Sequence, residues 1–177
     1  MGPAIAADDA GTLWSHTMRG DEPGTNTDWR VGIHTFTYYT ERPGLGVTGT
    51  KKTIDLDNVT GTPYMQGITY LMSANGDGAN GTGYIWIAAA SAKIARYTIS
   101  NGAYVAKDTY TTPLSGGTSP ASYYCYVKQH GNKVYYTTPA YDGSTMTAQA
   151  IYRGELSADG LSITWESTPV VADNYSP

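Results

Sequence analysis

Two stretches of the chain repeat each other: Ile94-Ala95-Arg96-Tyr97-Thr98-Ile99-Ser100 and Ile151-Tyr152-Arg153-Gly154-Glu155-Leu156-Ser157. A glycine follows each stretch, Gly102 after the first and Gly160 after the second. Runs that are rich in β-branched and aromatic residues and end at a glycine turn are typical of strands. Because self-similarity at a fixed spacing marks a repeated structural unit, the chain is predicted to contain copies of one strand arrangement.

The similarity extends to both sides of these stretches. In each copy an aromatic strand and another strand come before the repeated stretch, and a fourth strand follows it. These flanking strands are expected at residues 68–72, 84–87 and 104–107 in the first copy and at 124–128, 133–136 and 161–165 in the second. Residues 64–113 and 120–169 are therefore expected to form four strands each. A weaker third copy is expected at 28–62, with 35–39 as its aromatic strand and 51–56 as the strand after it.

The whole chain consists of short strand-like runs separated by turn residues, and helical periodicity is almost absent. Short strand-like runs bounded by Gly, Asn, Asp and Pro occur at residues 12–18, 31–40, 51–57, 67–72, 84–89, 93–100, 104–111, 122–128, 133–139, 148–157 and 161–168. The predicted fold class is all-β, with antiparallel sheets built from repeated four-stranded meanders. Residues 13–170 are interpreted as a single domain, 1–12 and 171–177 as terminal arms, and 73–83 as a long Gly/Asn loop.

One series of strands resembles the blades of β-propellers of the NHL type. It consists of Gln66-Gly67-Ile68-Thr69-Tyr70, then Gly83-Tyr84-Ile85-Trp86-Ile87, then Lys93-Ile94-Ala95-Arg96-Tyr97. The resemblance implies blades of four antiparallel strands. A closed propeller has at least four blades, and the chain offers two or three. Either several chains complete one ring, or the meanders form a sandwich, a barrel or an open β assembly.

Composition excludes several classes of function. The chain has 177 residues, a net charge of -4 and only 15% charged residues. Its longest basic run, Lys51-Lys52, is too short for the clustered positive charge that phosphate binding needs. No apolar stretch approaches the roughly 20 residues that cross a bilayer, and the first residues lack the basic and apolar regions of a signal peptide. Neither nucleic acid nor a membrane is an expected partner.

No residue pattern indicates catalysis, a cofactor or a metal. His16, His34 and His130 lie at no metal-ligand spacing. Cys125 is expected to be a small buried apolar residue, since free cysteine is often buried. The segment from Asn75 to Asn80 alternates oxygen-bearing side chains as calcium loops do, but it carries a single carboxylate and lacks the terminal Glu. It is interpreted as a hairpin loop. The chain is therefore expected to have no enzymatic activity.

The unusual feature of the composition is its number of Tyr and Trp residues, with 16 Tyr and 4 Trp against one Phe. On an exposed sheet, Tyr and Trp stack on sugar rings or fill the centre of a protein interface. Alternatively, they replace Leu and Phe in a half-buried core. The candidate glycan or interface aromatics are Tyr70, Trp86, Tyr97, Tyr126, Tyr135 and Trp165.

These features together favour a non-enzymatic structural protein of a virus, in the style of a phage capsid decoration (cement), spike or tail-associated component. The chain is rich in Thr, Gly and Tyr, poor in charge and nearly free of Cys. Its expected partners are copies of itself, a major capsid or tail protein, and a host surface glycan. Assembly is expected in the host cytoplasm, and the final location is the virion. The alternative is a lectin-like carbohydrate-binding module with one site per repeat.

Overall fold

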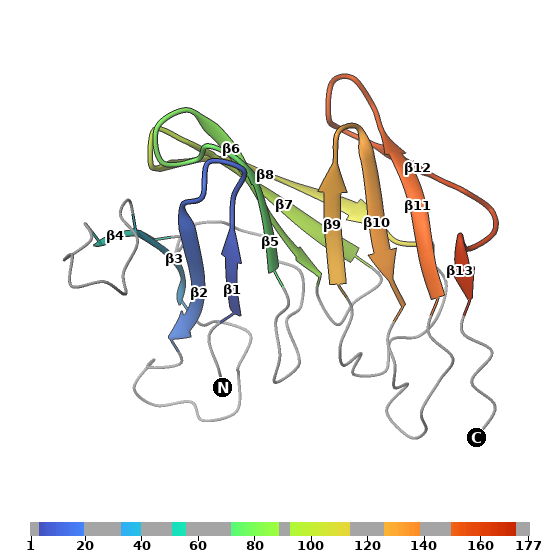
Figure 1. Cartoon of the computed structure of the whole chain (residues 1–177), viewed down its shortest axis with the longest axis horizontal. Helices are drawn as coiled ribbons and strands as arrows, with labels where there is room; N and C mark the ends of the chain where they lie inside the picture. Colours follow the sequence, from blue (N-terminus) through green and yellow to red (C-terminus); the bar gives the residue numbers. More distant parts are fainter. Residues whose placement is uncertain are drawn as a thin grey trace.

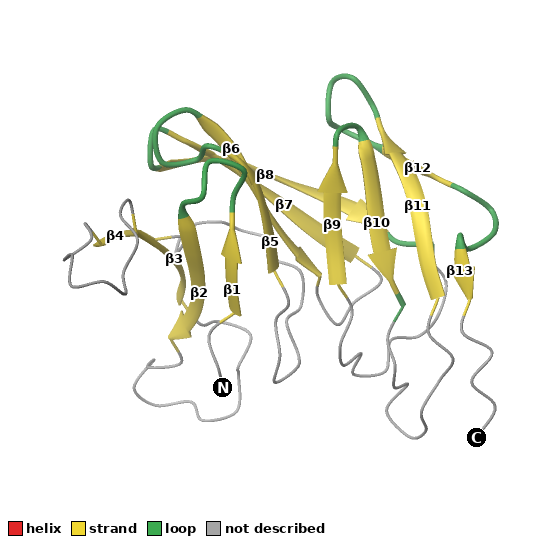
Figure 2. Ribbon diagram, in the orientation of Figure 1, coloured by secondary structure: helices red, strands yellow, loops and turns green. Residues whose placement is uncertain are grey.

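The computed structural model describes residues 4–19, 33–39, 51–55, 72–88, 93–113, 126–138 and 150–172. These residues form strands and turns, and Figure 2 shows no helix among them. No helix that could cross a membrane occurs in this part of the chain. The all-β fold class is confirmed.

The strands form three antiparallel meanders that follow one another along the chain (Figure 1). The first sheet contains β1 (Ala4–Ala7), β2 (Leu13–Arg19), β3 (Ile33–Tyr39) and β4 (Lys51–Asp55). The second contains β5 (Met72–Gly76), β6 (Thr82–Ala88), β7 (Lys93–Ser100) and β8 (Ala103–Thr111). The third contains β9 (Tyr126–His130), β10 (Lys133–Thr137), β11 (Ala150–Leu156) and β12 (Ile163–Trp165). The four strands named for each sheet keep sequence order, so the predicted repeated meander is present, and the third sheet has a fifth, short strand that pairs with β11. The three sheets do not close into a ring or barrel within the described residues.

Both predicted terminal arms contain strands. Residues 4–7 form β1, which pairs with β2 from Ala4 opposite His16 to Ala7 opposite Leu13. Near the other end, β13 (Val171–Ala172) pairs with β11 at Ile151 and Ala150. Alanine-rich segments carry little strand propensity, so β1 forms because β2 supplies a paired edge. Residues 8–12 connect β1 to β2, and residues 1–3 and 173–177 lie outside the described part of the chain.

The two strong copies have the expected strand order, with shifted boundaries. The repeated stretches at 94–100 and 151–157 fall in β7 and β11, the third strands of their sheets. The first strand of the second sheet is β5, so residues 73–76, expected in a loop, belong to a strand. Their pairing with β6 from Ser73–Trp86 to Gly76–Gly83 accounts for the difference. The strand expected at 67–72 lies outside the described residues except for Met72.

The third copy was placed wrongly by one strand. Residues 35–39, expected as a second strand, lie in β3, and residues 51–55 lie in β4. The first sheet therefore begins at β1 and not near residue 28. The true correspondence is carried by an aliphatic–aromatic pair on the second strand of each sheet: Leu13-Trp14, Ile85-Trp86 and Val134-Tyr135.

The second sheet lies between the other two and is buried on both faces. One face packs with Trp14 of the first sheet; its buried residues are Met72, Ala74, Ala79, Ile85, Ile87, Ala95, Tyr97 and Ile99. The other face packs against the third sheet; the buried residues of that interface are Trp86, Ile94, Tyr110, Val127, Val134, Tyr136 and Leu156. Near one edge of this arrangement, β1 contacts β5 and β5 contacts β9, as Figure 1 shows. Successive residues of a strand point to opposite faces, so Ile85 and Tyr97 are buried toward the first sheet while Trp86 and Ile94 are buried toward the third.

We predict that Asp8→Ala destabilises the first sheet and its contact with the second. The Asp8 carboxylate is 6% exposed and accepts hydrogen bonds from the Thr12 backbone N–H at 2.8 Å and from Trp14 Nε1 at 2.9 Å. Removing an acceptor from buried donors costs about 1–3 kcal/mol. Urea unfolding followed by tryptophan fluorescence measures the loss. Asp9→Ala is the matched control, because Asp9 is exposed and accepts one bond, from Gly76 N–H at 2.6 Å. Equal losses in the two variants would contradict the role given to Asp8.

Candidate functional site

The interface between the second and third sheets shows how one sheet of this protein recognises another. We call the face of a sheet that is directed toward the next sheet in the chain its forward face, and the opposite one its backward face. The forward face of the second sheet carries Trp86, Ile94, Arg96, Asp108 and Tyr110. It packs on the backward face of the third sheet.

Arg96 is the polar centre of this interface and is only 7% exposed. Its Nη2 lies 2.7 Å from Asp108 Oδ2 on the neighbouring strand and donates to the Gly160 carbonyl of the third sheet at 3.0 Å. The Tyr110 hydroxyl donates to the same carbonyl at 2.6 Å. Burial raises the pKa of Tyr110, so this hydroxyl stays a donor at neutral pH. Arg96 thus connects two strands of one sheet with a turn of the next.

Aromatic rings surround the Arg96 guanidinium. Its carbon lies 4.8 Å from the Tyr84 ring centroid and 5.7 Å from the centroids of Trp86 and Tyr110. Cations within about 6 Å of an aromatic face are attracted to it, and more strongly once desolvated. At Gly160, φ is +73°, and an added Cβ would stand 2.7 Å from Arg96 Nη2. The turn therefore needs glycine both for its backbone and for the approach of Arg96.

Four further hydrogen bonds join the sheets near β5 and β9, one of them from Lys128 Nζ to the Ala74 carbonyl at 3.1 Å. Ser73 Oγ donates to the Val127 carbonyl at 2.7 Å, and Asn75 Nδ2 donates to the Gln129 carbonyl at 3.1 Å. Trp86 Nε1 donates to Gln129 Oε1 at 3.0 Å. The side-chain donors of Ser73, Asn75 and Trp86 thus find acceptors across the interface, which fixes the relative position of the two sheets.

The forward face of the third sheet repeats the central part of this arrangement. Arg153 lies opposite Tyr135, as Arg96 lies opposite Trp86. Arg153 Nε donates to Glu166 Oε1 at 2.6 Å, so Glu166 takes the place of Asp108. The hydrogen bond and charge of Glu166 raise the pKa of Arg153. Whereas Arg96 is buried, the Arg153 and Glu166 side chains are 42% and 41% exposed. We take this face as the candidate functional site.

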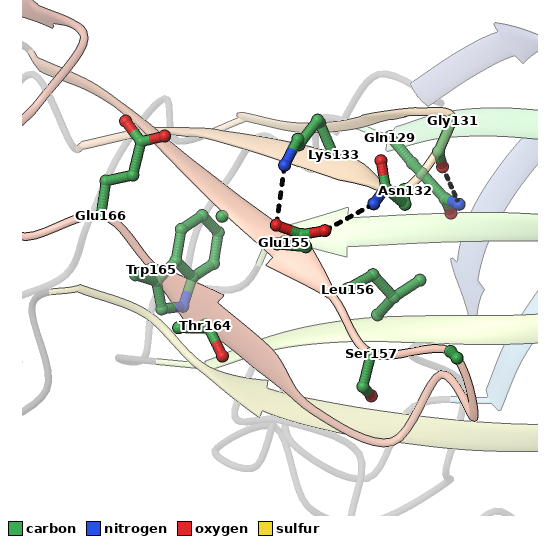
Figure 3. A pocket seen from close by; sticks show the side chains of 12 residues that line it. Gln129, Gly131, Asn132, Lys133, Glu155, Leu156, Ser157, Thr164, Trp165 and Glu166 are labelled. Carbon is green, nitrogen blue, oxygen red and sulfur yellow. Dashed lines mark hydrogen bonds and ion pairs between the residues drawn. The ribbon is translucent and has the colours of Figure 1, made fainter.

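An open groove of about 830 Å³ lies at one end of the third sheet (Figure 3). In it Glu155 accepts hydrogen bonds from Lys133 Nζ and Asn132 Nδ2, both at 2.8 Å. The bond and charge of Lys133 lower the pKa of Glu155. A general acid needs a raised pKa, so Glu155 is unsuited to that role. Its arrangement is that of a solvent-facing ion pair.

The structure separates the five described candidate aromatics into three groups. Trp86 and Tyr97 are 0% and 1% exposed, so neither can stack on a ligand from solution. Trp165 is half-buried beside Tyr136, with ring centroids 6.1 Å apart, and its Nε1 donates to the Thr111 carbonyl at 2.8 Å. Tyr126 and Tyr135 are half-buried and share the forward face of the third sheet. Tyr70 lies outside the described residues.

The other candidates from the sequence form no catalytic or metal-binding cluster among the described residues. His130 is exposed at the end of β9, and the side chains of His16, His34 and Cys125 lie outside the described part of the structure. In the loop from Asn75 to Asn80, Asp77 Oδ1 accepts the backbone N–H of Asn80 at 3.0 Å and its Nδ2 at 3.3 Å, which is the capping of a turn. Within the described residues no three His, Cys, Asp or Glu side chains lie close enough to hold a metal.

Sequence reasoning did not select the residues around which the two equivalent faces are built. Arg96 and Arg153 occupy the same position of the repeat, and that coincidence was a usable signal. Their acidic partners, Asp108 and Glu166, could not be assigned, because the register of the fourth strands comes only from the structure.

Comparison of the chain with protein-family models, with curated proteins and with solved structures found no match.

We predict that Arg96→Met and Arg153→Met have very different effects on stability, although the two residues are equivalent in the repeat. Arg96→Met leaves the partly buried Asp108 carboxylate without its ion-pair partner, and we expect a loss of about 2–3 kcal/mol. Arg153→Met acts on a solvent-exposed pair and should change the stability of a single copy far less. Urea unfolding of dilute protein, followed by circular dichroism, compares the two. Similar losses would contradict the assignment of one buried and one exposed face.

Proposed function

We propose that the chain is a non-enzymatic structural protein of a virus particle that works by packing its sheet faces against other protein subunits. One observation carries the proposal. The exposed forward face of the third sheet has the same aromatic–arginine–acid arrangement that the second sheet uses inside the chain to hold its neighbour. A sheet face with this arrangement is suited to packing against a sheet of another protein subunit.

The chemistry of this face fits a protein partner better than a small ligand. Two ion pairs on it are already formed, Arg153 with Glu166 and Lys133 with Glu155. Lys128, which lies opposite Tyr135, donates to the Ala74 carbonyl. Its uncharged positions include Tyr135 and Ile151, which are half-buried. Tyr and Arg are enriched in protein interfaces, and pairs of charges within one partner can enter an interface without leaving an unpaired charge.

The assignment to a virus particle rests on composition. The chain combines 15% charged residues, a single cysteine and 16 tyrosines with an all-β fold. Such a chain needs no metal, cofactor or disulfide to build its core. The proposed partners are copies of the chain and a major capsid or tail protein, with assembly in the host cytoplasm.

We expect the protein to be found in gradient-purified particles of the virus that encodes it. Mass spectrometry of the particles identifies it, and immunogold labelling with an antiserum places it on the capsid or tail. Loss of the protein from the particle fraction while it stays abundant in the infected-cell lysate would contradict the proposal.

A carbohydrate-binding role is the second candidate, favoured by Tyr126 and Tyr135 on one solvent-facing sheet face. Its test is a glycan array with the natural chain and Tyr126→Ala/Tyr135→Ala, whose folding is checked by circular dichroism. Binding that the double variant loses would support this role, and no binding by the natural chain would remove it. Trp86→Ala is unsuitable here, since Trp86 is fully buried and its truncation should cost about 3–5 kcal/mol.

A further inference from the structure

The aliphatic–aromatic pairs on the second strands of the sheets show that the arrangement has two open ends. In each pair the aliphatic residue points backward and the aromatic residue points forward. The aliphatic residue is buried in the second and third sheets, where Ile85 and Val134 are 1% and 0% exposed. In the first sheet the equivalent Leu13 is only half-buried. Its backward face is therefore open in the described structure.

The aromatic residues show the opposite trend. Trp14 and Trp86 are 1% and 0% exposed, because a following sheet covers each of them. Tyr135, at the equivalent position of the third sheet, is half-buried. Each copy of the chain thus has one open backward face, on the first sheet, and one open forward face, on the third.

The open backward face of the first sheet is apolar at its β1 edge, where Ile5, Ala7 and Leu13 lie, and continues by register through Ser15, Thr17 and Thr37. Ile5 lies opposite Ser15, and Ala7 lies opposite Leu13. Ile5 is 65% exposed, the second-highest exposure among the large apolar side chains described. An exposed apolar residue beside other apolar residues on a sheet face marks an interaction surface when several such residues are contiguous.

We propose that the forward face of the third sheet binds the backward face of the first sheet of a second copy of this chain. This inference rests on the proposed function, because it names the partner and the surfaces of that packing. A forward face meets a backward face twice inside the chain, between the first and second sheets and between the second and third. The contact between copies is the third instance of the same pairing, with Tyr135, Ile151 and Arg153 where Trp86, Ile94 and Arg96 lie within the chain.

The two contacting surfaces are different, so the contact is head-to-tail. A head-to-tail contact gives a closed ring when the rotation between copies closes, and an open filament when it does not. In either case a copy with one damaged face can still use its other face. That property separates this contact from a two-fold symmetric one, in which a single patch pairs with itself.

The experiment uses one substitution on each face and a mixture of the two variants. Ile5→Asp places a carboxylate on the backward face, and Ile151→Asp places one on the forward face. Each should reduce the natural oligomer to a monomer by light scattering coupled to gel filtration, because a buried unpaired charge is unfavourable. An equal mixture should give a dimer and nothing larger, since it contains one intact pair of faces.

Val105→Asp is the matched control, because Val105 on β8 is also strongly exposed, at 58%, but lies on neither open face. It should keep the natural mass. Circular dichroism checks that every variant is folded. If Ile151→Asp fails to fold, Tyr135→Ala removes the aromatic contact with no added charge and should raise the dissociation constant about tenfold or more.

Several outcomes would overturn the inference. These are a natural chain that is monomeric at every concentration, an Ile5→Asp variant with the natural mass, and a mixture that stays monomeric. A two-fold contact would leave one of the two variants fully assembled. If the chain is monomeric alone yet present in purified virus particles, the second copy is the wrong partner and the proposed structural function remains supported. If it forms the head-to-tail oligomer but is absent from particles, the contact between copies is supported and the proposed role in a virus particle is wrong.

Discussion

The structure depends on a charged side chain that is buried between two sheets. Arg96 is desolvated, and burying a charge is costly unless it is paired and hydrogen-bonded. Asp108 and the Gly160 carbonyl supply these partners, one from the same sheet and one from the next. Since both must be in place at once, the interface has one favourable register. The surrounding Tyr84, Trp86 and Tyr110 rings exclude water and attract the guanidinium, so the same residues provide the apolar contact and the specificity.

The position of the second sheet between two others explains the unusual composition. A sheet that is covered on both faces has side chains to bury on both of them, and Tyr and Trp fill much of that space while their polar atoms reach the edges of the interface. Trp86 shows this, because its ring is buried and its Nε1 bonds Gln129 of the third sheet. Much of the aromatic excess therefore lies between sheets. Among the half-buried aromatic residues, Tyr126 and Tyr135 lie on a face without a following sheet, whereas Tyr84 and Trp165 pack at the interface of the second and third sheets.

Strand existence and order could be predicted because they depend on local pattern. Residues 93–100 were expected as a strand and form β7 with the same bounds. Boundaries were predicted less well where the pattern is weak: Ala4–Ala7 has little strand propensity and forms β1 through its pairing with β2. The misplaced third copy has the same origin, since its two assigned strands matched in residue type but could not show which neighbour they would pair with. In the candidate site, the equivalence of Arg96 and Arg153 could be recognised from the repeat. Their acidic partners, Asp108 and Glu166, could not be identified from the sequence.

The sequence by itself determined that this protein is built from repeated antiparallel meanders, because alternation, glycine turns and the similarity of 94–100 to 151–157 are properties of neighbouring residues. Only the tertiary structure decided which faces of these meanders are covered. Arg96 and Arg153 stand at the same place in the repeat and each pairs with an acid, yet one is 7% exposed and the side chain of the other is 42% exposed. The physical reason is that burial depends on what packs above a residue, and that neighbour is distant in sequence.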